Sequence, residues 1–215
     1  MSRNTRLPSD ALYMLWGGSN DTFDAMRYYL DDPTQPGRLL QARGQIDTAL
    51  GAYGDIMRDL AAAGAEAMLV LNMGDGGLAP VYRDTPIAGL ARDFTQYFNL
   101  GLSALLDVLD AELTSLDLMR FDVYDFTTRL FNDPSAYGLT NVTESCIRPN
   151  TTVDPVCTNP DDYLFWDGVH STTAANALLA AEVLAQVPLP ATPLLVLSGL
   201  LALAHPRRRA IKPAL

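Results

Sequence analysis

The chain has 215 residues, of which 48% are hydrophobic and 19% charged, and its 15 Lys and Arg against 25 Asp and Glu give a formal net charge of −10. This length suits one α/β domain, and the apolar fraction can build a core, which excludes a wholly disordered chain. The acidic balance argues against a nucleic acid as partner, because phosphate backbones need a basic face. Two Cys and two His exclude a cysteine-rich zinc scaffold, so we expect no metal and no cofactor.

Three short apolar runs predict the strands of a parallel sheet. Residues 11–16 and 67–71 are uninterrupted apolar runs followed by glycine-rich segments, as is typical of strands buried on both faces. Residues 118–124 alternate between apolar and polar side chains, which indicates a strand nearer the sheet edge.

Helical periodicity predicts three helices. Residues 39–60 repeat apolar positions at spacings of three, four and seven, and Gly64 follows as a stop. A second helix begins near Pro86 and runs to Leu113, and a third covers residues 171–187. Three hydroxyl side chains at the start of the third are candidate caps: Ser171, Thr172 and Thr173.

The segment between the third strand and the last helix, residues 132–165, is rich in Pro, Asn, Asp and Thr and predicts a long ordered loop. The whole order is therefore strand-helix-strand-helix-strand-loop-helix. Such an order predicts an α/β fold in which helices cover a parallel sheet.

The composition changes after Val187, so we divide the chain into a domain at 1–187 and a tail at 188–215. The tail contains an apolar stretch of 14 residues, 191–204, followed by Arg207 to Arg209. As a helix the stretch would span ~21 Å, less than the ~30 Å core of a bilayer. Two interpretations stay open: a packed terminal helix, or a sorting signal whose arginines stay on the cytoplasmic side of a membrane.

The first chemically suggestive segment is Trp16-Gly-Gly-Ser-Asn-Asp21, directly after the first predicted strand. Ligands of α/β sheets lie beyond the carboxyl ends of the strands. Glycines let the backbone approach a substrate closely, and the Asn20 amide can donate a hydrogen bond. The alternative is a plain strand-to-helix turn with Asn20 as its cap.

The second segment is Phe165-Trp-Asp-Gly-Val-His170, just before the last predicted helix. Asp167 and His170 are three residues apart in a turn-prone stretch, so the carboxylate can reach the imidazole and fix its tautomer. An ordinary surface or capping histidine is the alternative. His205, the other histidine, belongs to the tail.

Together the two segments resemble the GDSL-type lipases and esterases of the SGNH hydrolase superfamily, in the phospholipase/lecithinase/hemolysin-like branch. Gly17 to Asp21 match the family's G-x-N-D block, and Asp167 to His170 match its D-x-x-H block. Residues 72–80, 134–143 and 157–160 are similar to other segments of that branch, and the resemblance covers roughly residues 10–187. It implies a three-layer αβα, flavodoxin-like fold around a parallel sheet.

The resemblance also implies roles for individual residues. His170 would be the general base, Asp167 its orienting partner, and Asn20 a donor to the oxyanion in a hole shaped by Gly18. Preorganised neutral donors of this kind can be worth ~3–4 kcal/mol each. In an exported protein Cys146 and Cys157 would form a disulfide worth about 2–3 kcal/mol, whereas in a cytosolic one they would be two thiols.

The sequence departs from the family at the nucleophile. The family places its serine in a G-D-S block after the first strand, and no Gly-Asp-Ser triplet occurs in these 215 residues. Four serines close to the start or the two blocks are poor replacements: Ser2, Ser9, Ser19 and Ser171. We therefore expect an N-terminally truncated domain that lacks its first strands and its nucleophile.

Two functions follow from this pattern. The first is a carboxylic ester hydrolase that acts on lipid or short-chain acyl esters by Ser-His-Asp acyl transfer and is inactive without the missing serine block. The alternative is a non-catalytic, surface-anchored fragment that binds a partner or is a relic. A metal-dependent hydrolase is disfavoured, because the globular part offers one histidine.

The tail from Val187 is similar to the VPLPA-type sorting signals of exported bacterial proteins. This resemblance implies an exosortase-like processing enzyme as a partner, and a membrane held through the tail. It also implies a bacterial protein that is exported to the cell envelope, the cell surface or the medium.

Overall fold

The computed structural model of the chain describes residues 6–147 and 157–187. Its main sheet contains β1 (Leu12–Trp16), β2 (Ala67–Leu71) and β3 (Asp117–Phe121), which are parallel and lie side by side in that order. These are the three predicted strands, and the α/β class with a parallel sheet is confirmed.

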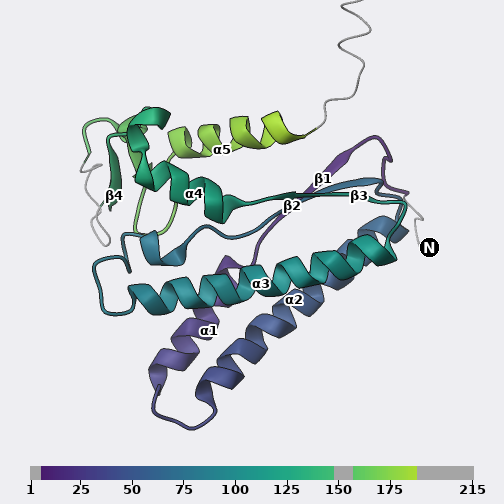
Figure 1. Cartoon of the computed structure of the whole chain (residues 1–215), viewed down its shortest axis with the longest axis horizontal. Coiled ribbons are helices and arrows are strands. Elements are labelled where there is room, and N and C mark those ends of the chain that lie inside the picture. The colour runs from purple at the N-terminus through teal and green to yellow at the C-terminus, as the bar shows by residue number, and fades with distance from the viewer. Residues whose placement is uncertain (1–5, 148–156, 188–215) are drawn as a thin grey trace, which may run out of the picture.

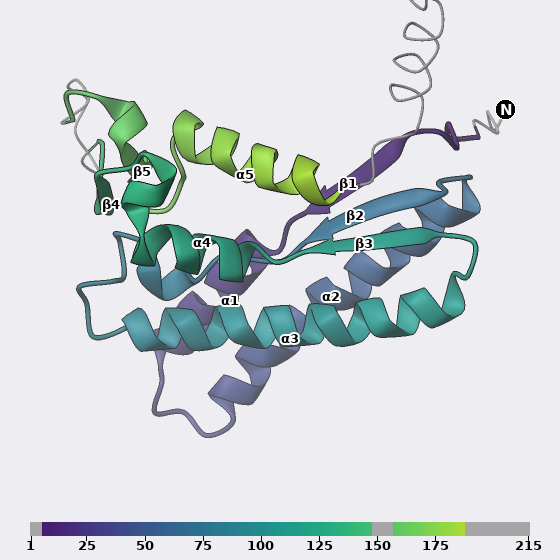
Figure 2. The ribbon, with the colours of Figure 1, turned by 45° about the horizontal axis from the view of Figure 1, so that its top comes forward.

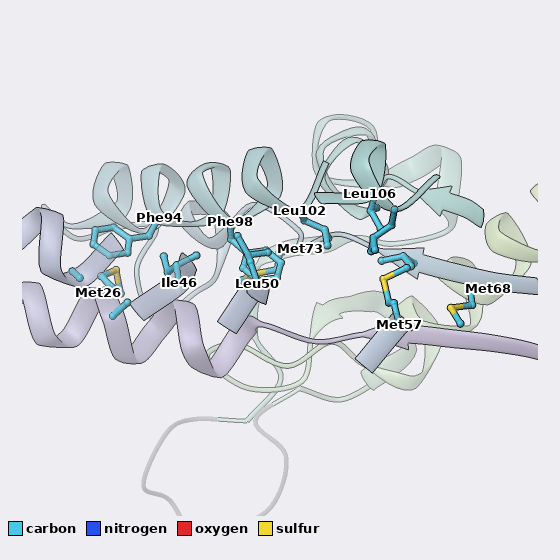
Figure 3. Packing of buried hydrophobic residues seen from close by; sticks show 14 of the residues in the cluster. Met26, Ile46, Leu50, Met57, Met68, Met73, Phe94, Phe98, Leu102 and Leu106 are labelled. Carbon is cyan, nitrogen blue, oxygen red and sulfur yellow. The ribbon is translucent and has the colours of Figure 1, made fainter. Parts of the chain in front are cut away.

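Three helices cover one face of this sheet: α1 (Ser19–Asp31), α2 (Arg38–Ala62) and α3 (Ala88–Glu112) (Figures 1 and 2). Of the apolar positions that predicted the second of these helices, Ile46, Leu50 and Met57 are buried, and Ile46 and Met57 are fully inaccessible, whereas Leu39 is 37% exposed. Figure 3 shows this first core, in which Met68 of β2 lies near Met57 and Leu106. Gly64 takes a left-handed φ of 108° just after α2, which ends this helix as predicted.

The opposite face carries a second core, built from α4 (Val123–Asn132) and α5 (Thr173–Gln186). Leu69, Leu71 and Phe121 of the sheet pack there. Beyond the carboxyl ends of the main strands lies a small parallel ribbon of β4 (Asn141–Ser145) and β5 (Tyr163–Phe165) (Figure 2). Three short 3₁₀ turns complete the described elements: η1 (Gly76–Leu78), η2 (Pro134–Tyr137) and η3 (Pro160–Asp162).

The second face is covered over β2 and β3 but open over β1. In the strand register Trp16 lies beside Leu71, and Met14 lies beside Leu69. Leu71 and Leu69 are 1% and 3% exposed, whereas Trp16 and Met14 are 49% and 61% exposed. Leu12, on the same face, is 43% exposed. The prediction that the strand at residues 11–16 is buried on both faces is therefore wrong for this face. We call Leu12, Met14 and Trp16 the open stripe of β1.

Several predicted elements need correction. Residues 19–31 were not predicted as a helix, and they form α1. The third strand ends at Phe121 rather than residue 124, because the Asp122 side chain accepts a hydrogen bond from the Asp125 N–H and starts α4. The predicted loop at 132–165 contains β4 and β5.

The last helix is close to its predicted bounds, and Thr172 is its cap among the three candidates. The predicted tail at 188–215 lies outside the described residues, so the predicted domain boundary at residue 187 stays a prediction. Within residues 6–147 and 157–187, no helix has the length and apolarity to cross a bilayer.

Candidate active site

Asp167 and His170 form a hydrogen-bonded pair in the turn between β5 and α5. His170 Nδ1 lies 2.8 Å from Asp167 Oδ2. The other carboxylate oxygen, Oδ1, accepts the N–H groups of Val169 at 2.9 Å and His170 at 2.7 Å. The Trp166 N–H donates to the His170 carbonyl at 2.8 Å and closes the turn. Asp167 and His170, three residues apart, thus belong to one turn. In this turn the Asp167 carboxylate forms hydrogen bonds with two backbone N–H groups and with the imidazole.

This arrangement determines which nitrogen of His170 can act as a base. An ionised carboxylate only accepts hydrogen bonds, so Nδ1 must carry the proton and Nε2 keeps its lone pair in the neutral ring. The His170 side chain is 76% exposed and the Asp167 side chain 29%. Partial burial raises the pKa of Asp167, but the two backbone N–H donors and the imidazole outweigh it and hold this pKa below its ordinary value.

Gly18 and Asn20 lie at the carboxyl end of β1, where α1 begins. Gly18 is the N-cap of α1 with a φ of 97°, and no side chain caps this helix. A Cβ at Gly18 would lie 2.2 Å from the Phe98 ring, so only glycine fits between β1 and α3 here. Asn20 is exposed in the first turn of α1, where helix N–H groups give a partial positive charge that favours an anion. The side chain is therefore a neighbour of the helix start rather than its cap.

Helix α3 connects Gly18 to the segment that follows β2. Next to Phe98, Asn99 makes a reciprocal pair with the backbone of Met73, accepting its N–H at 2.9 Å and donating to its carbonyl at 2.8 Å. The turn that follows η1 then reaches the catalytic candidates, because the Val81 N–H donates to the Gly168 carbonyl at 3.1 Å. The segment from Met73 to Val81 thus lies between α3, which packs near Gly18, and the Asp167–His170 turn.

The structure unites Asp167 and His170 directly, but it relates Asn20 to them only through this intervening segment. No hydrogen bond joins Asn20 to His170 in the described part of the chain. One surface hollow, of about 430 Å³, lies between η2, η3 and α5 and contains neither His170 nor Asn20. The second, about 190 Å³, lies between α3 and the ends of β2 and β3 and also excludes them. Neither of these two hollows therefore lies at the candidate base and donor.

Sequence reasoning missed a buried acid beside this region. The Asp75 side chain is 5% exposed and accepts a hydrogen bond from Arg92 of α3 at 2.7 Å. It also accepts the Tyr124 hydroxyl of α4 at 3.2 Å and the Gly77 N–H at 2.8 Å. Hydrogen bonding to this carboxylate raises the pKa of Arg92. The local sequence offers only the Asp75-Gly76-Gly77 turn as a signal. The other two partners come from α3 and α4, which are distant in the sequence.

Cys146 and Cys157 form the predicted disulfide, with their Cα atoms 4.8 Å apart. Both residues are buried, at 0% and 7% exposure. The bond follows β4 directly, so it lies at the edge of the ribbon whose other strand leads into Asp167.

Comparison with known proteins identifies the family of the chain. The family model of GDSL-like Lipase/Acylhydrolase matches residues 1–183, and the chain belongs to this family. It is 26% identical over 193 residues to the GDSL esterase/lipase APG of Arabidopsis thaliana, covering 82% of this chain and 53% of that protein. It is 27% identical over 206 residues to the GDSL esterase/lipase ENOD8 of Medicago truncatula, covering 83% and 52%. The chain spans about half the length of the curated relatives it matches.

Proposed function

We propose that this chain carries the base and oxyanion side of a carboxylic ester hydrolase that acts on lipid or short-chain acyl esters by Ser-His-Asp acyl transfer. The observation that carries the proposal is the 2.8 Å bond between Asp167 Oδ2 and His170 Nδ1. It orients the imidazole and leaves Nε2 as the base, as an esterase requires. Membership of the GDSL family supports ester hydrolysis in general.

Each residue then has a defined part in the reaction. His170 Nε2 takes the proton of a serine hydroxyl as its oxygen attacks the ester carbonyl carbon, and Asp167 stabilises the imidazolium that forms. The Asn20 amide donates to the developing oxyanion, next to the first turn of α1. Collapse of the tetrahedral intermediate breaks the ester C–O bond, and His170 returns its proton to the leaving alcohol. Water repeats the sequence on the acyl-enzyme and releases the acid.

The serine in this scheme comes from polypeptide outside these 215 residues. The sequence contains no Gly-Asp-Ser triplet, and the matched relatives are about twice as long as the matched region. The free edge of β1 supports the same proposal. Within residues 6–147 and 157–187, β1 pairs with β2 alone, and its carboxyl end leads directly to Gly18. A parallel strand added there would deliver its own carboxyl end beside Asn20.

The handedness of parallel crossovers explains the open stripe of β1 under this proposal. From β1 to β3 the chain moves in one direction across the sheet, with α1, α2 and α3 on the first face. A strand-helix-strand unit that moves outward from β1 travels the opposite way, so a right-handed crossover puts its helix on the second face. That helix would cover Leu12, Met14 and Trp16, which are the apolar side chains left exposed.

We further propose that the protein is an exported bacterial one, and that an exosortase-like enzyme processes its tail at the membrane. The disulfide supports export, because such bonds persist in oxidising compartments. The tail motif at 187–191 supports the processing step. Intact-mass measurement of the protein recovered from its native host tests it: a mass cut near this motif supports processing, and a full-length tail contradicts it.

The decisive experiment uses the DNA that encodes this chain. If the reading frame upstream contains a strand followed by Gly-Asp-Ser, the longer protein is expressed and assayed on p-nitrophenyl butyrate. His170→Ala should lower kcat by about 1,000-fold or more, and Asn20→Ala by roughly 100-fold. Asp24→Asn, an exposed carboxylate of the same helix, serves as control. A longer protein that stays active with His170→Ala would refute the assignment, and the lack of any such serine segment would favour the non-catalytic alternative.

A further inference from the structure

The backbone of β4 and β5 joins the disulfide to the Asp167–His170 turn. At the end of β4, the Cys146 N–H donates to the Phe165 carbonyl at 3.0 Å. The next residue, Ile147, donates its N–H to the Trp166 carbonyl at 2.8 Å. Trp166 immediately precedes Asp167, so the last hydrogen bond between the two chain segments is adjacent to the candidate catalytic carboxylate.

The disulfide holds the strand end that provides these two donors. The Cys157 N–H donates to the Cys146 carbonyl at 3.0 Å, beside the covalent bond between the two side chains. In the part of the chain that the structure describes, the ribbon has two strands, and its register is irregular between Asn141 and Ser145. Two-stranded ribbons are marginally stable in water on their own, so the covalent link at the strand end adds to the packing of Val142 and Leu164 in the second core in keeping β4 against β5.

The turn after η1 also contacts both the Asp167–His170 turn and β4. The Val81 N–H donates to the Gly168 carbonyl at 3.1 Å, and the Arg83 guanidinium donates to the Thr143 carbonyl of β4 at 3.3 Å. This turn therefore touches both the candidate catalytic turn and the strand that the disulfide anchors. If β4 leaves β5, the hydrogen bond from Ile147 to Trp166 is lost, and the Val81 contact loses the support of the bond from Arg83 to β4.

We propose that the Cys146–Cys157 disulfide positions the Asp167–His170 pair, so that both cysteines are positioning residues for the proposed ester hydrolysis. The role of the cysteines in ester hydrolysis rests on the proposed function, whereas the effect of the disulfide on the position of the Asp167–His170 pair does not. The competing account is that the disulfide only stabilises the whole domain and that the Val81 contact suffices to hold the turn.

The test compares the oxidised chain with the double variant C146A/C157A by NMR. The amide hydrogens of Val169 and His170 report the turn, because both donate to Asp167 Oδ1. Met57→Ala, a cavity in the first core, is the matched control for global destabilisation. In the double variant we expect native-state exchange of both amides to accelerate at least ~10-fold more than that of Leu102 in α3. We also expect the carboxyl pKa of Asp167 to rise toward its ordinary value.

The outcomes separate the two accounts. Met57→Ala should accelerate the amides of Val169, His170 and Leu102 together and leave the Asp167 pKa unchanged. The proposal is overturned if the double variant behaves in the same way. Should the double variant not fold, the oxidised chain is treated with dithiothreitol and exchange is followed in time. Exchange at His170 that precedes exchange at Leu102 supports positioning, and simultaneous exchange contradicts it. None of these measurements uses hydrolysis. They therefore test the coupling between the disulfide and the turn even if the proposed function is wrong.

Discussion

At the residue scale, Gly18 shows how strongly one position of the G-x-N-D block is constrained. Its φ of 97° and its contact with Phe98 both exclude a side chain. Gly37 offers a matched comparison, because its φ is 79° but no atom lies within 4 Å of an added Cβ. The two glycines therefore separate the cost of the backbone conformation from the cost of the steric clash.

We predict that Gly18→Ala lowers the free energy of unfolding by about 2–4 kcal/mol, through left-handed strain and overpacking together. Gly37→Ala should cost about 1 kcal/mol, because only the strain applies. Urea unfolding of both variants measures this difference. Equal losses would show that Phe98 yields freely to a methyl group and that Gly18 does not fix the start of α1.

The hydrogen bonds of Asp167 make a pH-dependent prediction. Because its pKa is lower in the folded protein than in the unfolded chain, the carboxylate contributes stability above the unfolded value of ~3.9, and this stability is lost as the pH falls through the folded pKa. Asp167→Asn should therefore destabilise the chain by roughly 1–2 kcal/mol at pH 7, and by less at pH 3. Urea unfolding of both proteins across this range is the measurement. A difference that stays constant with pH would contradict the assignment.

Sequence reasoning succeeded for residues whose partners are local. Asp167 and His170 lie within one turn, so their spacing alone predicted the contact that the structure contains. The roles assigned to them, to Asn20 and to Gly18 stay predictions. Asp75 could not be recognised as a buried acid from the sequence. Its partners Arg92 and Tyr124 come from two separate helices, and no local sequence pattern predicts contacts between such distant residues.

At the element scale, the long periodic segments were predictable and the short polar ones were not. Helices α2 and α3 bury regular apolar stripes, and β2 is a continuous apolar run. Helix α1 begins in a glycine-rich segment without a side-chain cap, and β4 has the polar sequence Asn-Val-Thr-Glu-Ser. Their structure comes from tertiary contacts with α2 and β5, and these contacts leave little trace in the local sequence.

Helix α5 follows the candidate catalytic turn and depends on Thr172. Its hydroxyl accepts the Ala175 N–H at 3.1 Å as the N-cap and donates to the Tyr163 carbonyl of β5 at 2.6 Å. We predict that Thr172→Ala lowers the free energy of unfolding by about 1–3 kcal/mol. Thr173→Ala, at the exposed neighbouring position, should cost less than about 0.5 kcal/mol. Chemical denaturation of the two variants measures both values, and similar losses would contradict the assignment of the cap.

At the scale of the whole molecule, the open stripe of β1 and the edge of β1 that has no partner strand within residues 6–147 and 157–187 dominate the expected solution behaviour. An unpaired apolar strand edge is a site for intermolecular pairing. We predict that the chain self-associates, and that Met14→Lys weakens this association by roughly tenfold or more through charge on the edge. Leu40→Lys, on α2 and 77% exposed, is the control and should have little effect. Sedimentation velocity over a concentration series tests this, and a monomeric wild-type chain would contradict it.

We propose that these 215 residues hold the base and the oxyanion donor of an ester hydrolase but not its nucleophile. The most direct test is hydrolysis of p-nitrophenyl butyrate by the purified chain beside its His170→Ala variant. Our account predicts that the two proteins give the same background rate, because His170 has no hydroxyl to activate. Hydrolysis by the unmodified chain that His170→Ala abolishes would contradict it, since a nucleophile would then lie within these residues.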